Sequence, residues 1–282
     1  MIRGQHCASV AVRRPDGTIA LRSDLISPFF AGRARKLPLV RGVATLVETL
    51  TIGMRALMFS ANVGLEEEGE EIDKGTMAAV LAVALLFAVV LFFLVPVLAS
   101  RPLEGLMGSD VVSNLTEGLI RLAIFLAYVV LIGRIGQIER VFMYHGAEHM
   151  TVHAQEHHDA LEVGSVRSYP TAHPRCGTAF LLVVMIVSIF VFTFVGREPF
   201  WWLITSRIVF IPLIAAISYE AVRYSGFHSG NPFVRLIAAP SLALQALTTR
   251  QPEDDQIEVA IAAMKEAITT DEGLIDEHED RA

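Results

Sequence analysis

The stretch MAAVLAVALLFAVVLFFLVPVLA, residues 77–99, decides the fold class of this chain. Its 23 residues include no charged side chain. At about 1.5 Å of rise per residue, a helix of this length crosses the roughly 30 Å hydrocarbon layer of a bilayer. The stretch therefore predicts a transmembrane helix.

Three further apolar stretches predict spans. Residues 178–195 are an uncharged run of 18 residues that a Gly-Arg-Glu-Pro sequence ends. Residues 115–132 are apolar apart from Glu117 and Arg121, whose i,i+4 spacing lets the two charges neutralise each other on one helix face. Residues 200–218 begin with two interfacial aromatic residues and contain one arginine. We expect the two charge-bearing spans to face a protein interior.

The composition agrees with a membrane protein. Hydrophobic residues make up 53% of the 282 positions, which is high for a soluble domain. The net charge is −7 and the lysines and arginines are scattered, so a nucleic-acid-binding surface is excluded. Only Cys7 and Cys176 are present, far apart in sequence, which argues against a disulfide framework and suits a reducing compartment.

The distribution of lysine and arginine indicates on which side of the membrane each flanking segment lies. Residues 1–76 carry ten lysines and arginines, whereas the short loops near Pro102 and Pro199 carry one arginine each. Segments rich in lysine and arginine stay in the cytosol. We therefore expect a bacterial inner-membrane protein with both termini, and residues 133–177, on the cytosolic side.

The first two parts of the chain differ in character. Residues 1–76 form a cytosolic or interfacial segment. In it, ASVAVRRPDGTIALR predicts a β-hairpin around its Pro-Asp-Gly turn, and residues 39–60 predict an amphipathic helix. Residues 77–223 form the four-helix transmembrane region, with a histidine-rich cytosolic loop at 133–177.

The last two parts are expected to surround that region. Residues 224–250 are re-entrant or interfacial, because their apolar run is short and contains Pro240. Residues 251–282 form an acidic cytosolic tail with one amphipathic helix near 257–268. The predicted fold class is a mainly α, polytopic membrane protein with about four transmembrane helices, an N-terminal β-hairpin and interfacial amphipathic helices.

The stretch YHGAEHMTVHAQEHH contains an H-x-x-E-H pattern made by His145, Glu148 and His149. On a helix, i and i+4 put both imidazoles on one face, where they can share a zinc ion. This is the inverted zincin pattern, in which Glu148 acts as the general base that activates a metal-bound water. Such a short pattern also arises by chance where histidines are dense. His153 extends the same face, and whether it is a ligand or a solvent-facing residue is left open. The last two histidines of the stretch are expected to be loop residues.

A second cluster, HPRCG, places His173 and Cys176 just before the apolar run at 178–195. Histidine and cysteine are ordinary zinc ligands, although a turn with a small buried cysteine explains the same residues. Because both clusters lie at the same membrane boundary, a site shared with His145 and His149 is one of the two interpretations.

Glu220, in the sequence SYEAVR, lies near the cytosolic end of the last predicted span. A carboxylate at that depth is costly unless it binds a cation, a metal or Arg223. Glu220 is therefore the candidate carboxylate ligand. The expected cofactor is a divalent metal ion, with zinc as the first choice.

The chain resembles the YqhQ-like family of bacterial membrane proteins, a domain of unknown function with a predicted metal-dependent activity. The resemblance rests on RRPDGTI, LPLVRGVATLVETLTIGMRALMFSAN, YHGAEH, VRSYPTAHPRCGTAFLLVVMIVSI, ISYE and LTTRQPEDDQIEVAI, in this order. It implies a polytopic membrane protein with a metal centre. On matching positions it points to the ligand-type residues already named: His145, Glu148, His149, His173, Cys176 and Glu220.

Three functions fit these features. The first is a membrane-embedded, metal-dependent hydrolase. The second is a metal-binding or transport protein, with Glu117, Arg121, Arg207 and Glu220 lining a polar path. The third is a non-catalytic membrane scaffold or assembly factor. The expected partners are the lipid bilayer and either a second copy of the chain or another membrane protein.

Overall fold

The long apolar stretch is part of an extended helical segment in the computed structural model, which describes residues 1–26, 37–66, 73–173, 176–228 and 230–279. The segment consists of α3 (Lys74–Val89), the π-helical turn η3 (Val90–Leu94) and α4 (Val95–Ser100). The short helices η4 (Arg101–Leu103) and α5 (Glu104–Met107) continue it. The helix predicted at 77–99 is therefore confirmed, within an apolar candidate span of 33 residues, Gly75–Met107.

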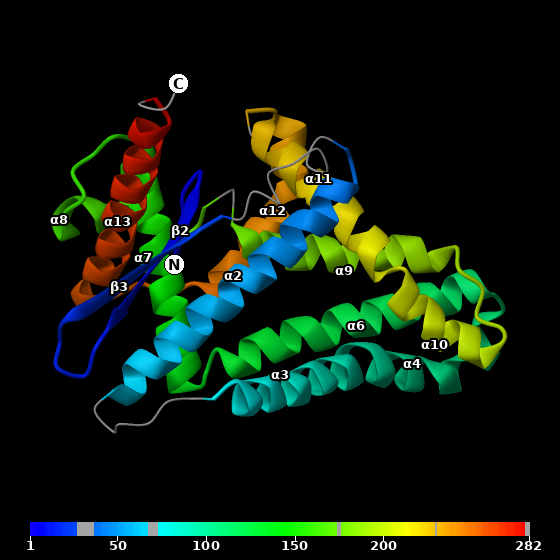
Figure 1. Ribbon diagram of the computed structural model, residues 1–282. Helices are drawn as coiled ribbons and strands as arrows, with labels where there is room; N and C mark the ends of the chain where they lie inside the picture. The colour runs from blue at the N-terminus through cyan, green and yellow to red at the C-terminus, as the bar shows by residue number, and fades with distance from the viewer. Residues whose placement is uncertain (27–36, 67–72, 174–175, 229, 280–282) are drawn as a thin grey trace.

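Local chemistry sets the ends of this segment. Asp73 caps α3, because its Oδ1 accepts hydrogen bonds from the backbone N–H groups of Gly75 (2.6 Å) and Thr76 (3.1 Å). Pro96 lies in the first turn of α4, where a missing N–H donor is tolerated. Gly108 has a φ of 66°, a left-handed conformation that favours glycine. The chain reverses there, and α6 (Asp110–Ile132) returns alongside α4 (Figure 1).

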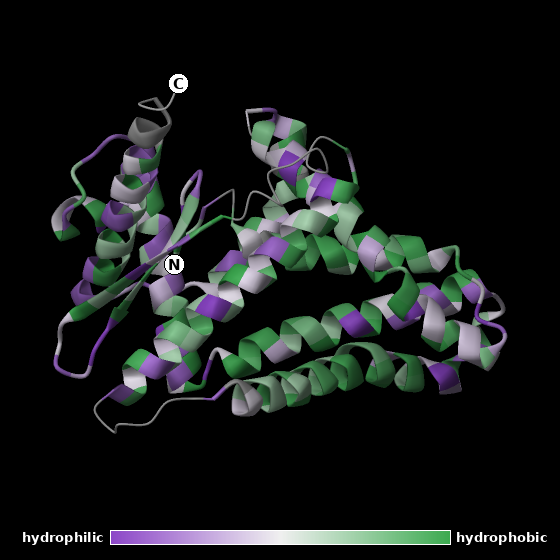
Figure 2. Ribbon diagram, viewed as in Figure 1, coloured by the Kyte–Doolittle hydropathy of each residue, from purple (hydrophilic) through white to green (hydrophobic). Residues whose placement is uncertain are grey.

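Among the described residues, three helices are long and apolar enough to cross a membrane: α2 (Val40–Leu65), the segment Gly75–Met107 and α6. A fourth span results if α10 (Phe200–Val209) and α11 (Ile211–Phe227), which meet at a 42° bend, are counted together. The apolar helix α9 (Gly177–Thr193) has 17 residues. Hydrophobic residues dominate α3, α4, α6 and α9 in Figure 2. The chain is a mainly α-helical membrane protein, as its sequence predicts.

Three predicted helices differ in detail from the structure. Residues 200–218 were expected to form one continuous helix, but the helix breaks at Phe210, because Pro212 lacks the N–H that would continue the hydrogen-bond ladder. Helix α9 ends at Thr193 rather than at residue 195. Helix α2, predicted as an amphipathic helix at 39–60, is longer and also qualifies as a span by length and composition.

Helix α12 (Pro232–Thr248) runs through Pro240 and packs against α9. Its Leu244 belongs to an apolar cluster with Phe125 of α6 and Leu182 of α9. The short apolar run near the C-terminus is therefore a helix that packs on the transmembrane region. The re-entrant or interfacial position of this segment stays a prediction.

A cluster of charged side chains is buried where α6 meets α10. Glu117 is 1% exposed and accepts hydrogen bonds from Arg121 (2.6 Å), Arg197 (2.8 Å) and Arg207 (2.9 and 3.0 Å). The Asn114 side-chain oxygen accepts hydrogen bonds from Arg197 and Arg207. The predicted pair of Glu117 and Arg121 is confirmed, and two arginines distant in sequence join it. These contacts stabilise charges that would be costly in an apolar bundle.

The two ends of the chain meet in a small lobe beside the apolar helices (Figure 1). The strands β1 (Ile2–Arg3), β2 (Cys7–Arg13) and β3 (Ile19–Leu25) form an antiparallel sheet in the order β1-β2-β3, which confirms the predicted hairpin and adds a strand. The sheet packs with α7 (Gly136–Glu156), α8 (Val163–Val166) and α13 (Asp254–Glu279). We call these six elements the sheet lobe.

Helix α13 supplies much of the core of the sheet lobe. Its Ile257 packs with Met150 of α7 and Val166 of α8, and all three side chains are fully buried. Its Met264 belongs to a second cluster with Cys7 of β2. The helix predicted at 257–268 is confirmed and longer than expected. It is a core element rather than part of a peripheral tail, because its apolar face is covered by both α7 and the sheet.

Candidate metal centre

Three histidines share one face of α7. His145, His149 and His153 are spaced by four residues, and α-helical geometry places such residues about 40° apart around the axis. The rings of His145 and His149 lie edge to face, with centroids 4.3 Å apart. The helix that the H-x-x-E-H pattern requires is therefore present, and both of its imidazoles point the same way.

Cys176 faces this row from the start of α9. It is the N-cap residue of α9, and its Sγ accepts a hydrogen bond from the Thr178 backbone N–H at 3.3 Å. The same Sγ lies 3.2 Å from Nε2 of His145. A helix N-terminus carries a partial positive charge, so this position favours a thiolate.

Backbone carbonyls fix the orientation of both imidazoles. Nδ1–H of His145 donates to the Thr248 carbonyl at 2.9 Å, and Nδ1–H of His149 donates to the Thr171 carbonyl at 2.6 Å. Because Nδ1 is the protonated nitrogen in both rings, Nε2 is left with the lone pair in the neutral form. Metal-bound histidines usually have their second nitrogen held in this way.

The three side chains fit a common ion. One ligand atom each from His145, His149 and Cys176 lies within 4.8 Å of the other two. Ligand atoms on one tetrahedral zinc ion, with bonds of about 2.0 to 2.3 Å, lie roughly 3.3 to 3.8 Å apart. The 3.2 Å contact between His145 and Cys176 is close to this spacing. We call His145, His149 and Cys176 the thiolate group.

The electrostatics of the thiolate group favour a charged sulfur. Burial alone would raise the pKa of the Cys176 thiol, but hydrogen bonds from His145, His149 and Thr178 lower this pKa to about 5. Burial also acts to lower the pKa of His145, but its hydrogen bond to Cys176 raises this pKa above the usual range. A thiolate is the form of cysteine that binds metal ions.

His173 does not join the thiolate group, although a site shared by His145, His149, His173 and Cys176 was one of the two interpretations of the sequence. It comes together with His153 and Glu156, whose ligand atoms lie within 4.8 Å of one another and of its own. His173 lies in the segment before α9, whereas Cys176 is the N-cap residue of that helix, so the two side chains do not share a helix face. Pro174 and Arg175, between them, lie outside the described residues.

Glu220 lies apart from both groups of ligand-type residues. It is on α11, where its carboxylate accepts hydrogen bonds from the Arg41 guanidinium of α2 and from the Leu39 backbone N–H at 3.3 Å. The cation in contact with this half-buried carboxylate is Arg41. The helix pair α2 and α11 explains the charge at this depth.

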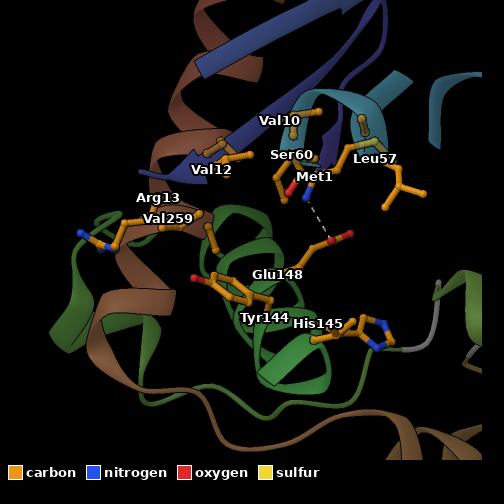
Figure 3. A pocket seen from close by; sticks show the side chains of 16 residues that line it. Met1, Val10, Val12, Arg13, Leu57, Ser60, Tyr144, His145, Glu148 and Val259 are labelled. Carbon is orange, nitrogen blue, oxygen red and sulfur yellow. Dashed lines mark ion pairs between the residues drawn. The ribbon is translucent and has the colours of Figure 1, made fainter. Parts of the chain in front are cut away.

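Glu148 faces a pocket of about 540 Å³ that lies between α7, the sheet, α13 and α2. The pocket is lined by apolar side chains of β2, α2 and α13, and by the polar residues Tyr144, His145 and Glu148. Figure 3 shows the Glu148 carboxylate directed at the Met1 amino group, 3.5 Å away, while the His145 ring turns to another side. His145 therefore belongs both to the thiolate group and to the wall of this pocket.

Sequence reasoning missed the backbone partners of the site. The carbonyls of Thr171 and Thr248 orient the histidines, but a carbonyl is present in every residue and carries no sequence signal. Glu156 was not identified as a ligand-type partner of His173. Its spacing of three residues from His153, on one helix face, is a signal that could have found it.

Two comparisons with known proteins bear on these residues. The family described as "Protein of unknown function (DUF1385)" matches residues 37–270, a range that contains every ligand-type residue discussed above. The chain is 30% identical, over 290 residues, to "Uncharacterized protein YqhQ" of Bacillus subtilis (strain 168). That alignment covers 95% of this chain and 89% of the relative. No solved structure matches the chain.

Proposed function

We propose that this chain, which belongs to the DUF1385 family of YqhQ-like proteins, is a zinc-dependent hydrolase of a bacterial inner membrane. The observation that carries the proposal is the thiolate group. In this group, two imidazoles with carbonyl-bound Nδ1–H groups and one thiol bring their ligand atoms within 4.8 Å of one another. Nitrogen and sulfur donors are the ligands that zinc prefers.

The number of ligands supports a reactive site rather than a closed structural one. Structural zinc ions are usually held by four protein ligands, whereas catalytic zinc ions keep an open position beside three. The thiolate group supplies three, and His145 also lines the adjacent pocket. A zinc ion held by this group would therefore keep one position for water or a substrate.

The residues of this chain divide the chemistry between them. When bound, a zinc ion lowers the pKa of a coordinated water to about 7 and so supplies hydroxide at neutral pH. His145, His149 and Cys176 hold the position at which that water is activated. Glu148 would be the base that accepts a proton from that water, and the largely apolar pocket beside it would hold the substrate.

Zinc analysis of the purified full-length protein in detergent tests the metal site. We expect wild-type protein to contain zinc, and His149→Ala and Cys176→Ser each to lose about one equivalent per chain, because three ligands define the site. His228→Ala is a matched control, since His228 is exposed at the C-terminal end of α11, where its ring contacts Tyr224 and neither group of ligands. Folded wild-type protein without bound zinc would refute the proposal.

The catalytic role of Glu148 is tested separately. Glu148→Gln should keep its zinc but lose the hydrolysis of 4-nitrophenyl acetate, a general probe for metal-bound hydroxide, by roughly 10²- to 10⁴-fold. An unchanged rate would favour the second candidate, a non-catalytic metal-binding protein. The observation in favour of that candidate is the contact of the Glu148 carboxylate with the Met1 amino group rather than with either group of ligands.

The transport alternative receives less support from the charged residues of the spans. Arg121 and Arg207 both bind Glu117. Glu220 binds Arg41 instead of continuing a polar path. An ion path needs polar groups that remain open to the ion. The contacts of these residues are better explained as stabilising the bundle.

The orientation of the protein is part of the proposal. The excess of lysine and arginine in residues 1–76 supports a cytosolic N-terminus. Because α13 from the C-terminal part packs against β2 in the sheet lobe, both ends should lie on one side of the membrane. A C-terminal green fluorescent protein fusion should therefore fluoresce, and a C-terminal alkaline phosphatase fusion should be inactive. The opposite pattern would reverse the assignment.

A further inference from the structure

A second group of ligand-type side chains lies beside the thiolate group. His153 and Glu156 are three residues apart near the C-terminal end of α7, so they share one face of the helix. His173 reaches them from the loop between α8 and α9. One ligand atom from each lies within 4.8 Å of the other two. We call His153, Glu156 and His173 the carboxylate group.

A buried glutamine holds the loop that carries His173. Gln245 of α12 is 0% exposed, and its side-chain carbonyl accepts a hydrogen bond from the His173 backbone N–H at 2.8 Å. Its side-chain NH₂ donates to the His173 backbone carbonyl, also at 2.8 Å. A shift of the loop would leave these buried polar groups without hydrogen bonds, which is unfavourable. His173 is therefore held in place before any ligand binds.

The histidine of α7 in this group is oriented like those of the thiolate group. Nε2–H of His153 donates to the Ala172 carbonyl at 2.9 Å, so Nδ1 keeps the lone pair in the neutral ring. The residue before Ala172 in the same loop supplies the carbonyl that orients His149. One short loop segment thus fixes two rings of α7.

The two groups form one continuous array. The ring of His173 lies 4.6 Å from that of His153 and 5.8 Å from that of His149, measured between centroids. The ligand at one end of the array is the soft sulfur of Cys176, and the ligand at the other end is the harder carboxylate of Glu156. Because thiolate and carboxylate ligands favour different metal ions, the two ends differ in metal preference.

We propose that His153, Glu156 and His173 bind a second divalent transition-metal ion, next to the thiolate group. Two imidazoles and one carboxylate form a ligand set that accepts iron, manganese or zinc and leaves coordination positions open. The inference does not depend on the hydrolase proposal, because none of its ligands belongs to the thiolate group. The simpler alternative is that Glu156 and His173 only share a hydrogen bond, which is 3.3 Å long.

Cobalt(II) is a probe that separates the two sites. Full-length, metal-free protein in detergent is titrated with Co²⁺, and bound metal is measured together with the absorption spectrum. A cobalt ion on Cys176 gives a thiolate charge-transfer band in the near ultraviolet, whereas a cobalt ion on nitrogen and oxygen ligands gives only weak visible bands. We expect about two equivalents of Co²⁺ per chain in the wild type.

Variants assign each equivalent to its ligands. Glu156→Gln and His153→Ala should lose one equivalent and keep the charge-transfer band. Cys176→Ser should lose the band and keep the visible bands of the carboxylate group. His157→Ala is the matched control, because His157 is an exposed neighbour that lies outside both groups. This control should retain both equivalents.

The outcomes distinguish the two proposals. If the wild type binds one equivalent with the charge-transfer band, and Glu156→Gln leaves both unchanged, the second site is refuted while the thiolate site stands. If the band is absent in the wild type but Glu156→Gln still loses metal, the second site stands alone. Circular dichroism of each variant shows whether a lost equivalent reflects a lost ligand or a lost fold. A variant that unfolds is replaced by His173→Gln, which must also lose one equivalent.

Discussion

Replacing Glu117 by Gln should be among the most destabilising conservative changes in the chain. Glu117 is 1% exposed and accepts four hydrogen bonds from three arginines, which are themselves buried. Gln has nearly the same shape, but it removes the only negative charge among the fully buried groups of this cluster. Its NH₂ group would also face a guanidinium group where a carboxylate oxygen now accepts hydrogen bonds.

The size of the effect follows from these contacts. Hydrogen bonds to charged groups contribute about 1.5 to 3 kcal/mol each, and removing one partner of a buried ion pair costs about 3 to 5 kcal/mol. The four bonds are not independent, because they share one carboxylate. We therefore expect the free energy of unfolding to fall by about 3 to 5 kcal/mol, which lowers the melting temperature by roughly 6 to 20 °C.

Thermal loss of helical circular dichroism in one detergent, for wild type and variants side by side, measures this change. Glu104→Gln is the matched control. Glu104 pairs with Arg197 of the same cluster, but its side chain is 37% exposed, so the loss should be about 1 kcal/mol or less. Adding Arg207→Met to Glu117→Gln should recover part of the stability, since it removes an uncompensated charge. A fall below 1 kcal/mol for Glu117→Gln would refute the reasoning.

Three other predictions concern the candidate metal centre. Gly146→Ala should lower both the melting temperature and the zinc content, because a Cβ there would lie 2.2 Å from the Arg250 carbonyl oxygen. Gly136→Ala is the control. A Cβ at Gly136 would have no atom within 4 Å, so this variant should match wild type in both measurements. In metal-free protein, iodoacetamide should label Cys176 near neutral pH and more slowly as the pH falls through its pKa of about 5. Burial raises the pKa of Cys7 to about 11, so mass spectrometry should find it unlabelled until unfolding; early labelling would contradict this. Removal of the bound metal ion by a chelator should increase the hydrogen exchange of backbone amides in α7 but not in α6. Equal increases in both helices would argue against a metal site located at α7.

The apolar helices could be predicted because each carries its own signal. The run at 77–99 has no charge, and a bilayer leaves such a sequence few alternatives to a helix. The partners of Glu117 could be predicted only in part. Arg121 is four residues away on the same helix, whereas Arg197 and Arg207 are 80 and 90 residues away and no local pattern connects them.

The role of the C-terminal part was harder to predict than its helix. The apolar spacing around Ile257 predicts an amphipathic helix, but it does not say what covers the apolar face. The covering elements are α7 and a sheet that begins more than 240 residues earlier, and this pairing has no signature in a single sequence. The acidic composition of the tail pointed to solvent instead.

The candidate site shows the same limit. Helical spacing predicted that His145 and His149 share a face, because that relation is local. Which residue near the start of α9 faces which ring depends on tertiary contacts that local spacing does not encode, so His173 and Cys176 could not be assigned to different groups. Glu220 was equally able to bind a metal ion or an arginine, and its partner is Arg41, 179 residues away.

The thiolate group brings together ligand atoms from different parts of the fold. His145 and His149 belong to the sheet lobe, Cys176 begins the apolar helix α9, and the carbonyl that orients His145 is at the end of α12. These ligand atoms come together only when the lobe is docked on the helices. A metal ion that binds the docked form alone stabilises it by about 2.7 kcal/mol at one hundred times its dissociation constant. If the thiolate group binds a metal ion as proposed, metal binding and docking of the sheet lobe are coupled, and a change in either must change the other by the same free energy.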